Sequence, residues 1–178
     1  MKKTIYVISL LFVICCTLSC ESDDLNYQND FKNSEKAWIS FKQSSNNSYQ
    51  YIVTGGSVFT TYGWETTITV YNGVIIKRHF KYNADPENIP EENLEWTENE
   101  NEINSEEHQY TSAATALTLD EVYDKAKKEW LIKRKDVSIY FETENNGLIS
   151  TCGYVPKNCM DDCFYGITIK SIETLSVD

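Results

Sequence analysis

Cysteine is the residue type in this chain that offers the most chemistry, and the first cysteine to consider is Cys20. It ends a stretch that begins with two lysines and continues through uncharged, mostly apolar residues over 4–19. This apolar run is shorter than the roughly 20 residues that span a bilayer, and a small residue, Ser19, precedes the break. These features are typical of a secretory signal. We therefore expect residues 1–19 to be a signal peptide, with an uncleaved N-terminal anchor helix as the alternative.

A signal peptide that stops at a cysteine resembles the lipobox of bacterial lipoproteins, in which the thiol receives a lipid and the new N-terminus an acyl chain such as palmitate. On this resemblance Cys20 is the lipidation site and the first residue of the mature protein. The sequence departs from the usual motif at Thr17, where leucine is common, and Leu18 follows one place late. Cys16 fits less well because no small residue precedes it. The alternative is a stray cysteine behind an ordinary signal.

The segment that follows Cys20 is acidic and has little to bury. Residues 21–30 hold four acids and no base, so we expect residues 20–30 to be a lipidated cysteine and a solvated tether. Such an acidic run also resembles surface-export signals of lipoproteins in some Gram-negative bacteria, whereas in others an Asp beside the cysteine retains the protein at the inner membrane. The expected location is the cell envelope, lipid-anchored at the outer membrane or cell surface. The inner membrane facing the periplasm is the alternative.

Three cysteines, Cys152, Cys159 and Cys163, remain in the body of the chain. A location outside the cytoplasm favours one disulfide and one spare thiol, and three pairings are open. We take Cys152–Cys163 as the working pair, with Cys159 as the alternative partner. A zinc cluster of these thiols beside Asp161 and Asp162 is the competing interpretation, but no histidine lies close in sequence.

The other residues that could do chemistry give little support for catalysis. His79 lies among bases in an expected strand, His108 ends an acidic run, and no G-x-S-x-G elbow accompanies them. Asp161 and Asp162 are adjacent in one loop, so they cannot flank a glycosidic bond at about 5–9 Å, and turn or capping roles are expected. Calcium would find oxygens in residues 85–107 but no EF-hand pattern. We predict no catalytic, cofactor-binding or metal-binding residues and no cofactor.

Charge limits the partners of the mature chain. Removing residues 1–19 leaves 14 bases and 27 acids, a net charge of −13. This balance argues against nucleic acid, whose phosphates need a basic surface, and against electrostatic docking to anionic lipid headgroups. Residues 31–178 are enough for a single domain, which at this length buries about 68–70% of its extended surface.

The elements that would position these residues begin with a helix over 31–43. Phe31, Trp38 and Phe41 recur there at near-helical spacing, and Asp30 or Ser34 is available as the N-cap.

Strands follow this helix. Alternating Tyr49 and Tyr51 predict one strand, and Asn72-Gly73 between two β-rich runs predicts a hairpin, because both residues tolerate positive φ. The alternation of the hairpin places apolar residues on both faces. One face would carry Trp64, Ile68, Val70 and Ile75, and the other Tyr71, Val74, Ile76 and Phe80.

Residues 85–107 contain ten acids and no base. A structureless loop of this length is unusual in a compact domain, so we expect a mobile excursion with a short strand near Leu94 and Trp96.

A second helix follows, opened by a capping box of Thr118 and Glu121. Its apolar stripe comprises Leu119, Val122, Tyr123, Ala126 and Trp130, and the bases at 133–135 complement its dipole. Three more strands are expected after it, with a turn at Asn146-Gly147. The predicted fold is α+β: an antiparallel sheet of five to seven strands with two helices packed on one face.

The order of these features resembles an uncharacterised family of bacterial lipoproteins and secreted proteins, a domain of unknown function. The resemblance covers about residues 35–172 and rests on mostly structural motifs. These are Trp38, Tyr49 and Tyr51, the "VYNGV" turn, "TLDEVY" at 118–123, Gly147, and Asp161-Asp162. The chain departs from the family at Gly147-Leu148-Ile149, where Gly-Tyr-Pro is frequent. The resemblance implies no enzymatic activity.

The expected function is that of a lipid-anchored envelope lipoprotein, a non-enzymatic binding or accessory module held at the membrane through lipid on Cys20. Its ligand would be a protein or a glycan, and a glycan site would need Trp64, Trp96 and tyrosines lined up on an exposed face. One alternative is an inhibitor or immunity-type protein that uses the acidic loop 85–107 against a basic partner. The other is a hydrolase of unrecognised type.

Overall fold

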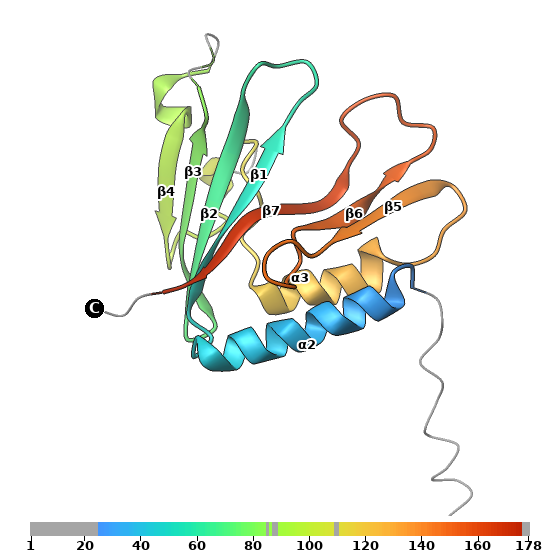
Figure 1. Ribbon diagram of the computed structural model, residues 1–178. Helices are drawn as coiled ribbons and strands as arrows, with labels where there is room; N and C mark the ends of the chain where they lie inside the picture. The colour runs from blue at the N-terminus through green and yellow to red at the C-terminus, as the bar shows by residue number, and fades with distance from the viewer. Residues whose placement is uncertain (1–24, 85, 87–88, 109–110, 176–178) are drawn as a thin grey trace, which may run out of the picture.

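The computed structural model describes residues 25–84, 86, 89–108 and 111–175 (Figure 1). The signal peptide predicted over 1–19 and the lipidation site predicted at Cys20 lie outside the described residues. Within them the chain forms seven strands: β1 (Tyr49–Gly56), β2 (Gly63–Tyr71), β3 (Val74–Tyr82), β4 (Glu95–Asn99), β5 (Val137–Glu142), β6 (Thr151–Pro156) and β7 (Tyr165–Thr174). The helices are α2 (Gln28–Ser44) and α3 (Leu119–Lys125), which continues as a π-helical segment, Ala126–Trp130.

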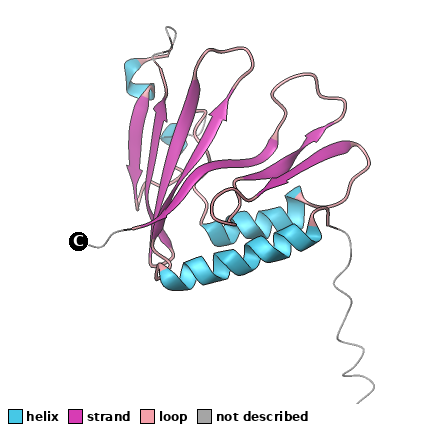
Figure 2. Ribbon diagram, in the orientation of Figure 1, coloured by secondary structure: helices cyan, strands magenta, loops and turns pink. Residues whose placement is uncertain are grey.

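The strands form one antiparallel sheet in the order β4-β3-β2-β1-β7-β6-β5, and α2 and α3 lie side by side against one of its faces (Figure 2). The predicted α+β class, with an antiparallel sheet and two helices on one face, is therefore confirmed. Three single-turn 3-10 or π segments complete the described helical structure: Glu91–Asn93, Glu106–His108 and Ala126–Trp130. In the part of the chain that the structure describes, no helix combines the length and apolarity needed to cross a bilayer.

Strand β7 joins the two halves of the sheet by changing partner along its length. Its first residues pair with β6, where Cys152 lies opposite Ile167, and its later residues pair with β1, where Tyr51 lies opposite Ile172. The register against β1 shifts next to Val53, which bends the strand and turns the halves relative to each other.

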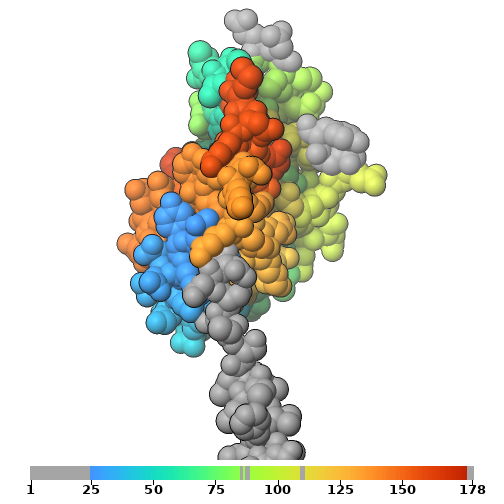
Figure 3. Space-filling model, turned by 90° about the vertical axis from the view of Figure 1, so that its right-hand side faces the viewer, coloured from blue at the N-terminus to red at the C-terminus, as the bar shows by residue number. Residues whose placement is uncertain are grey.

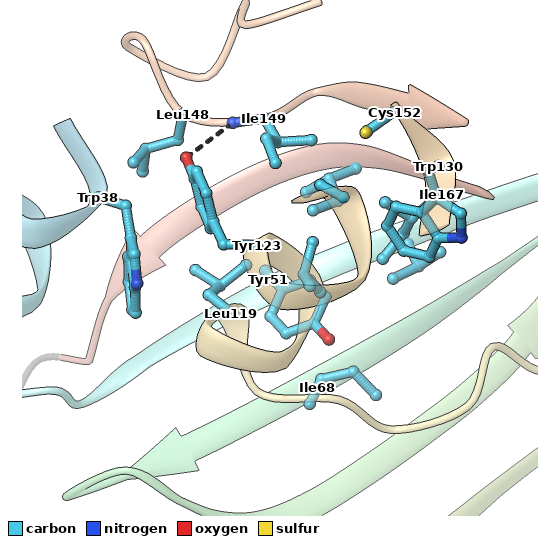
Figure 4. Close-up of a cluster of buried hydrophobic side chains, with 14 of the residues drawn as sticks. Trp38, Tyr51, Ile68, Leu119, Tyr123, Trp130, Leu148, Ile149, Cys152 and Ile167 are labelled. Atoms are coloured by element: carbon cyan, nitrogen blue, oxygen red, sulfur yellow. Dashed lines mark hydrogen bonds between the residues drawn. The ribbon is translucent and has the colours of Figure 1, made fainter. Parts of the chain in front are cut away.

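The core lies between the sheet and the two helices (Figure 4). Trp38 of α2 stacks on Tyr123 of α3 at 6.0 Å between ring centroids, and Tyr51 and Ile68 contribute the floor from the sheet. The buried Tyr123 hydroxyl is paired, because it lies 2.7 Å from Ser34 Oγ and accepts the Ile149 N–H at 3.4 Å. The alternating strand tyrosines are paired as well, because Tyr49 accepts the Leu119 N–H at 2.8 Å and Tyr51 donates to the Leu117 carbonyl, so their rings fill the core while their hydroxyls are satisfied.

Helix α3 begins as its sequence predicts. Thr118 accepts the Glu121 N–H, and the Glu121 carboxylate accepts the Thr118 N–H at 2.7 Å, which completes the capping box. The predicted stripe is buried: Leu119, Val122, Tyr123, Ala126 and Trp130. The helix continues as a π-helical turn from Ala126. Arg134 donates to the Glu129 carbonyl at 2.8 Å, so one of the predicted bases pairs with a free carbonyl at the C-terminal end of the helix.

Helix α2 begins earlier than predicted. It starts at Gln28 behind Tyr27 in the left-handed conformation, and within the described chain no side chain caps it there. Asp30 and Ser34, the predicted caps, lie inside the helix, and Ser34 faces the core instead.

The predicted tether over 20–30 is therefore too long. Asn26 N–H donates to the Leu131 carbonyl at 2.8 Å, and Leu25 forms a β-bridge with Ile132. The domain thus begins by Leu25, and only residues 21–24 separate it from Cys20.

The predicted faces of the β2–β3 hairpin are partly wrong. Asn72 and Gly73 make the turn with φ of 49° and 81°, as predicted. Val70 pairs with Ile75 but Thr69 pairs with Lys77, so Ile76 is a bulge residue that reverses the alternation along β3. Phe80 consequently lies opposite Thr66 and is buried on the same face as Ile68, not on the opposite face.

Candidate functional site

The acidic segment 85–107 is attached to the sheet by an ion pair that sequence reasoning missed. Its central residues form β4, the short strand predicted near Trp96, which pairs with β3. Glu98 of β4 accepts from Arg78 Nη1 at 3.0 Å, and both side chains are buried. The prediction of a mobile excursion is therefore wrong for this part of the segment, because a strand pairing and a buried charge pair both hold it.

The Glu98 carboxylate gathers donors from the loop that follows β4. It accepts from the Asn104 N–H at 2.7 Å and Ser105 Oγ at 3.1 Å, and lies 3.0 Å from His108 Nδ1. Burial by itself would raise the pKa of Glu98, but the hydrogen bonds from Asn104, Arg78 and His108 lower it below the usual glutamate range. Glu98 is thus an ionised hub that organises the segment.

Aromatic stacking covers this hub. Trp96 lies between His108, whose ring is 3.8 Å away and almost parallel, and Phe80 at 5.3 Å, with the Arg78 guanidinium 4.9 Å from the Trp96 ring. His108 is therefore held between Glu98 and Trp96. His79 points from β3 to the opposite face of the sheet, where it lies 2.8 Å from Glu95. The two histidines are separated by the sheet and do not share a site.

The aromatic platform that a glycan site would need is not formed by the two predicted tryptophans. Trp96 is buried under His108, and Trp64 is only partly exposed, with its ring directly over Gly55 and 6.3 Å from Tyr82.

The anchored acidic segment presents its other carboxylates to solvent. Between residues 89 and 108, which the structure describes, Glu98 is the one buried acid, and seven are exposed: Glu91, Glu92, Glu95, Glu100, Glu102, Glu106 and Glu107. The buried Glu98 carboxylate thus holds in place the surface formed by these seven exposed glutamates, which we call the acidic face.

A groove of about 740 Å³ runs between α2 and α3. Trp38 lines this groove, and its ring N–H donates a hydrogen bond to the Asp120 carboxylate at 3.0 Å. Lys42 forms an ion pair with the same carboxylate at 2.6 Å. Burial raises the pKa of Tyr123, which also lines the groove, to about 12, so its hydroxyl stays protonated at neutral pH. Within the groove Lys42 and Asp120 neutralise each other, and Tyr123 offers no base near neutral pH.

The open face of the sheet carries a second ion-pair group. Glu65 accepts from Lys170 at 2.6 Å and lies 3.7 Å from Lys81, and the hydrogen bond from Lys170 lowers the pKa of Glu65. These contacts tie β2, β3 and β7 together on the face that the helices leave uncovered.

Two loops at one end of the sheet are interlocked. Asp162, in the β6–β7 loop, accepts from Ser57 Oγ and from the Val58 N–H at 3.1 Å, both in the β1–β2 loop. The Ser57 and Val58 hydrogen bonds lower the pKa of Asp162. Asp162 therefore has the capping role predicted for it, but it caps a distant loop, 105 residues away from Ser57 in sequence.

The disulfide lies in this loop as well, and its partners correct the predicted pairing. Cys159 bonds to Cys163 with Cα atoms 6.2 Å apart, and among the cysteines that the structure describes Cys152 is free, so the working pair Cys152–Cys163 is wrong. Cys152 lies on β6, opposite Phe141, with its side chain in the core. Burial raises the pKa of its thiol to about 12. A strand residue facing the core cannot reach a loop that projects beyond the strand ends.

Sequence reasoning also missed the exposed apolar residues of these loops. The exposed fractions of Val58, Phe59 and Met160 are 75%, 73% and 93%. The sequence did contain a signal: the apolar pair Val58-Phe59 lies between Gly55-Gly56 and a polar run, in a segment too short to form a strand. We call the two loops, residues 57–62 and 157–164, the apolar tip.

Comparison with protein-family models, with curated proteins and with solved structures finds no match for this chain.

Proposed function

We propose that this protein is a lipid-anchored lipoprotein of the cell envelope that acts as a non-enzymatic binding or accessory module. The binding role is supported by one observation: the acidic and histidine side chains that could take part in catalysis instead hold surface segments in place. Glu98 and His108 fasten a surface segment, and Asp162 fastens a loop. Those contacts hold surfaces in place, which is what a recognition module requires.

The lipid anchor is proposed at Cys20, with palmitate among its acyl chains. Each buried methylene contributes about 0.8 kcal/mol, so two or more chains give stable attachment. The proposed location is the outer membrane or cell surface, with the periplasmic side of the inner membrane as the alternative. Leu25 supports a close attachment, because its β-bridge to Ile132 leaves only four residues between the domain and the anchor.

Replacing Cys20 tests the anchor. Cys20→Ala should move the protein from the membrane fraction to the soluble fraction and abolish labelling by an alkyne analogue of palmitate. Cys152→Ser is the matched control, since it removes a thiol elsewhere and should leave both readouts unchanged. Retention of the Cys20 variant in membranes, or a mass spectrum of the purified wild type with residues 1–19 intact, would contradict the proposal.

A second candidate function is favoured by the acidic face. Seven exposed glutamates lie on a segment that a strand and a buried ion pair hold in place, so their arrangement is fixed before any partner arrives. An inhibitor or immunity-type protein that blocks a basic surface would need such preorganised charge, because it steers association and selects the partner.

A further inference from the structure

The apolar tip is built as a rigid projection. The Phe59 N–H donates to Ser57 Oγ at 3.1 Å, and Thr60 Oγ1 donates to the Tyr62 carbonyl at 2.8 Å, which fixes the turn of the first loop. Asp162 joins that turn to the second loop, and Cys159–Cys163 closes the second loop. Apolar side chains on flexible loops would fold back, whereas these are held outward, so little conformational entropy is lost on binding.

Exposed large apolar groups gathered in one place mark interaction sites more often than scattered ones do. Phe59, Val58 and Met160 form such a group, because the loops that carry them are hydrogen-bonded to each other. Figure 3 shows the two loops in contact at one end of the molecule.

The position of the apolar tip argues against the protein's own membrane as its partner. In Figures 1 and 3 the tip lies at the end of the molecule away from the start of α2. Residues 21–24 can span at most about 15–18 Å between Cys20 and the fixed Leu25. If Cys20 carries lipid, so short a tether keeps the Leu25 side next to the bilayer and points the tip outward.

The charges around the tip indicate the chemistry of its partner. Glu91 and Glu92 are exposed at the same end of the sheet, where Tyr82 N–H donates to the Leu94 carbonyl at 3.0 Å. Asp161 is exposed within the tip itself; the bases described nearest are Lys157, in the second loop, and Lys81, which lies 3.7 Å from Glu65. A surface with this excess of acid repels anionic lipid headgroups and favours a protein with basic residues.

We propose that the apolar tip docks into an apolar pocket with a basic rim on a second envelope protein. Phe59, Val58 and Met160 enter the pocket, and Asp161, with Glu91 and Glu92, faces the rim. The outward orientation rests on the proposed anchor at Cys20, whereas the docking itself rests on the exposed residues and their charges.

Photo-crosslinking in intact cells tests the docking with the full-length protein. The photoreactive residue p-benzoylphenylalanine replaces Phe59 or Met160. In matched controls it replaces Val74, the first residue of β3, which is 53% exposed, or Ile39 on α2. Positions 59 and 160 should crosslink to one and the same protein, which positions 74 and 39 do not reach. Crosslinks to lipid, a product of twice the chain's own mass, equal yields at position 74, or no crosslink would each overturn the proposal.

The crosslinked protein is then identified by mass spectrometry, purified, and titrated with the purified full-length chain. Val58→Ser together with Phe59→Ser should weaken binding about tenfold or more, and Asp161→Lys should weaken it most at low salt. Val74→Ser should leave the affinity unchanged. An affinity that none of the tip variants alters would overturn the proposal. If Cys20→Ala stays in the membrane while the crosslink persists, the anchor proposal fails and the docking proposal stands.

Discussion

At the scale of single residues, the buried position of Glu98 makes the acidic segment an ordered part of the fold. Its carboxylate is 1% exposed, meets Arg78 at 3.0 Å and organises three donors of the following loop. Removing one member of a buried ion pair leaves the other charge uncompensated, which costs more than the pair itself contributes. The ion pair also selects the edge strand, because β4 can pair with β3 in only one register while Glu98 faces Arg78.

Glu98→Gln should lower the free energy of unfolding by about 3 kcal/mol at neutral pH. The folded-state pKa of Glu98 lies below its unfolded value of 4.5, so its contribution is complete above that value and is lost as pH falls through the folded pKa. The difference between wild type and variant should therefore shrink as the pH falls below about 4.5, through the lowered folded-state pKa of Glu98.

Urea denaturation across this pH range measures the effect. Glu100→Gln, an exposed neighbour, is the control and should change stability by less than about 0.5 kcal/mol. A loss for Glu98→Gln that is the same at every pH would show that packing, and not ionisation, accounts for the role of Glu98.

Sequence alone could not have found this residue. Arg78 and Glu98 are 20 positions apart, and in a run of ten acids the inward carboxylate looks like its neighbours. The cysteine pairing failed for a similar reason, because which thiol is spare depends on which one the core encloses. By contrast, Asn72-Gly73 and Thr118–Glu121 were predictable, since their contacts close within two or three residues.

At the scale of elements, local signals predicted where helices and strands form better than which way they face. The β3 bulge at Ile76 arises from pairing with β2, so the alternation of β3 misleads although both strands are correctly expected. Helix α2 extends back to Gln28 because its start is fixed by the contact of Asn26 with Leu131, not by a cap. Tertiary contacts set the details that periodicity leaves open.

The capping box of α3 gives a prediction at this scale. Thr118→Ala removes the side-chain acceptor for the Glu121 N–H and should lower the free energy of unfolding by about 1 kcal/mol, measured by urea denaturation. Thr118→Ser keeps the hydroxyl and should cost only a few tenths of that. Equal losses in both variants would mean that the threonine methyl group, not the cap, stabilises the helix start.

At the scale of the whole molecule, charge and shape divide the surface into different roles. The acidic face runs along the β4 edge, the apolar tip lies at one end of the sheet, and the helices cover the face opposite the ion pairs of Glu65. The fold class and the helical layer were predictable from sequence, whereas the interlocked loops were not, because Ser57 and Asp162 are 105 residues apart.

The acidic face gives a prediction at this scale. If it binds a basic partner, Glu100→Lys, Glu102→Lys and Glu106→Lys together should abolish capture of that partner from solubilised envelopes and remove the salt dependence of capture. The matched control reverses three exposed acids elsewhere, Glu142, Glu144 and Glu173, with the same change in net charge. Capture that responds equally to both triple variants would reflect net charge alone and would count against the inhibitor-type role.

The β-bridge between Leu25 and Ile132 has a mechanical consequence. If lipid on Cys20 anchors the chain as proposed, a pulling force on that anchor would enter the domain at Leu25 and load the Asn26–Leu131 hydrogen bond first, just after the end of the π-helical segment Ala126–Trp130. The next element along the chain is α2, which is held against the sheet because Trp38 and Phe31 are buried in the core. Under the proposed anchor, such a force would detach only the first few residues before α2 resists it, and the sheet and its loops would keep their shape.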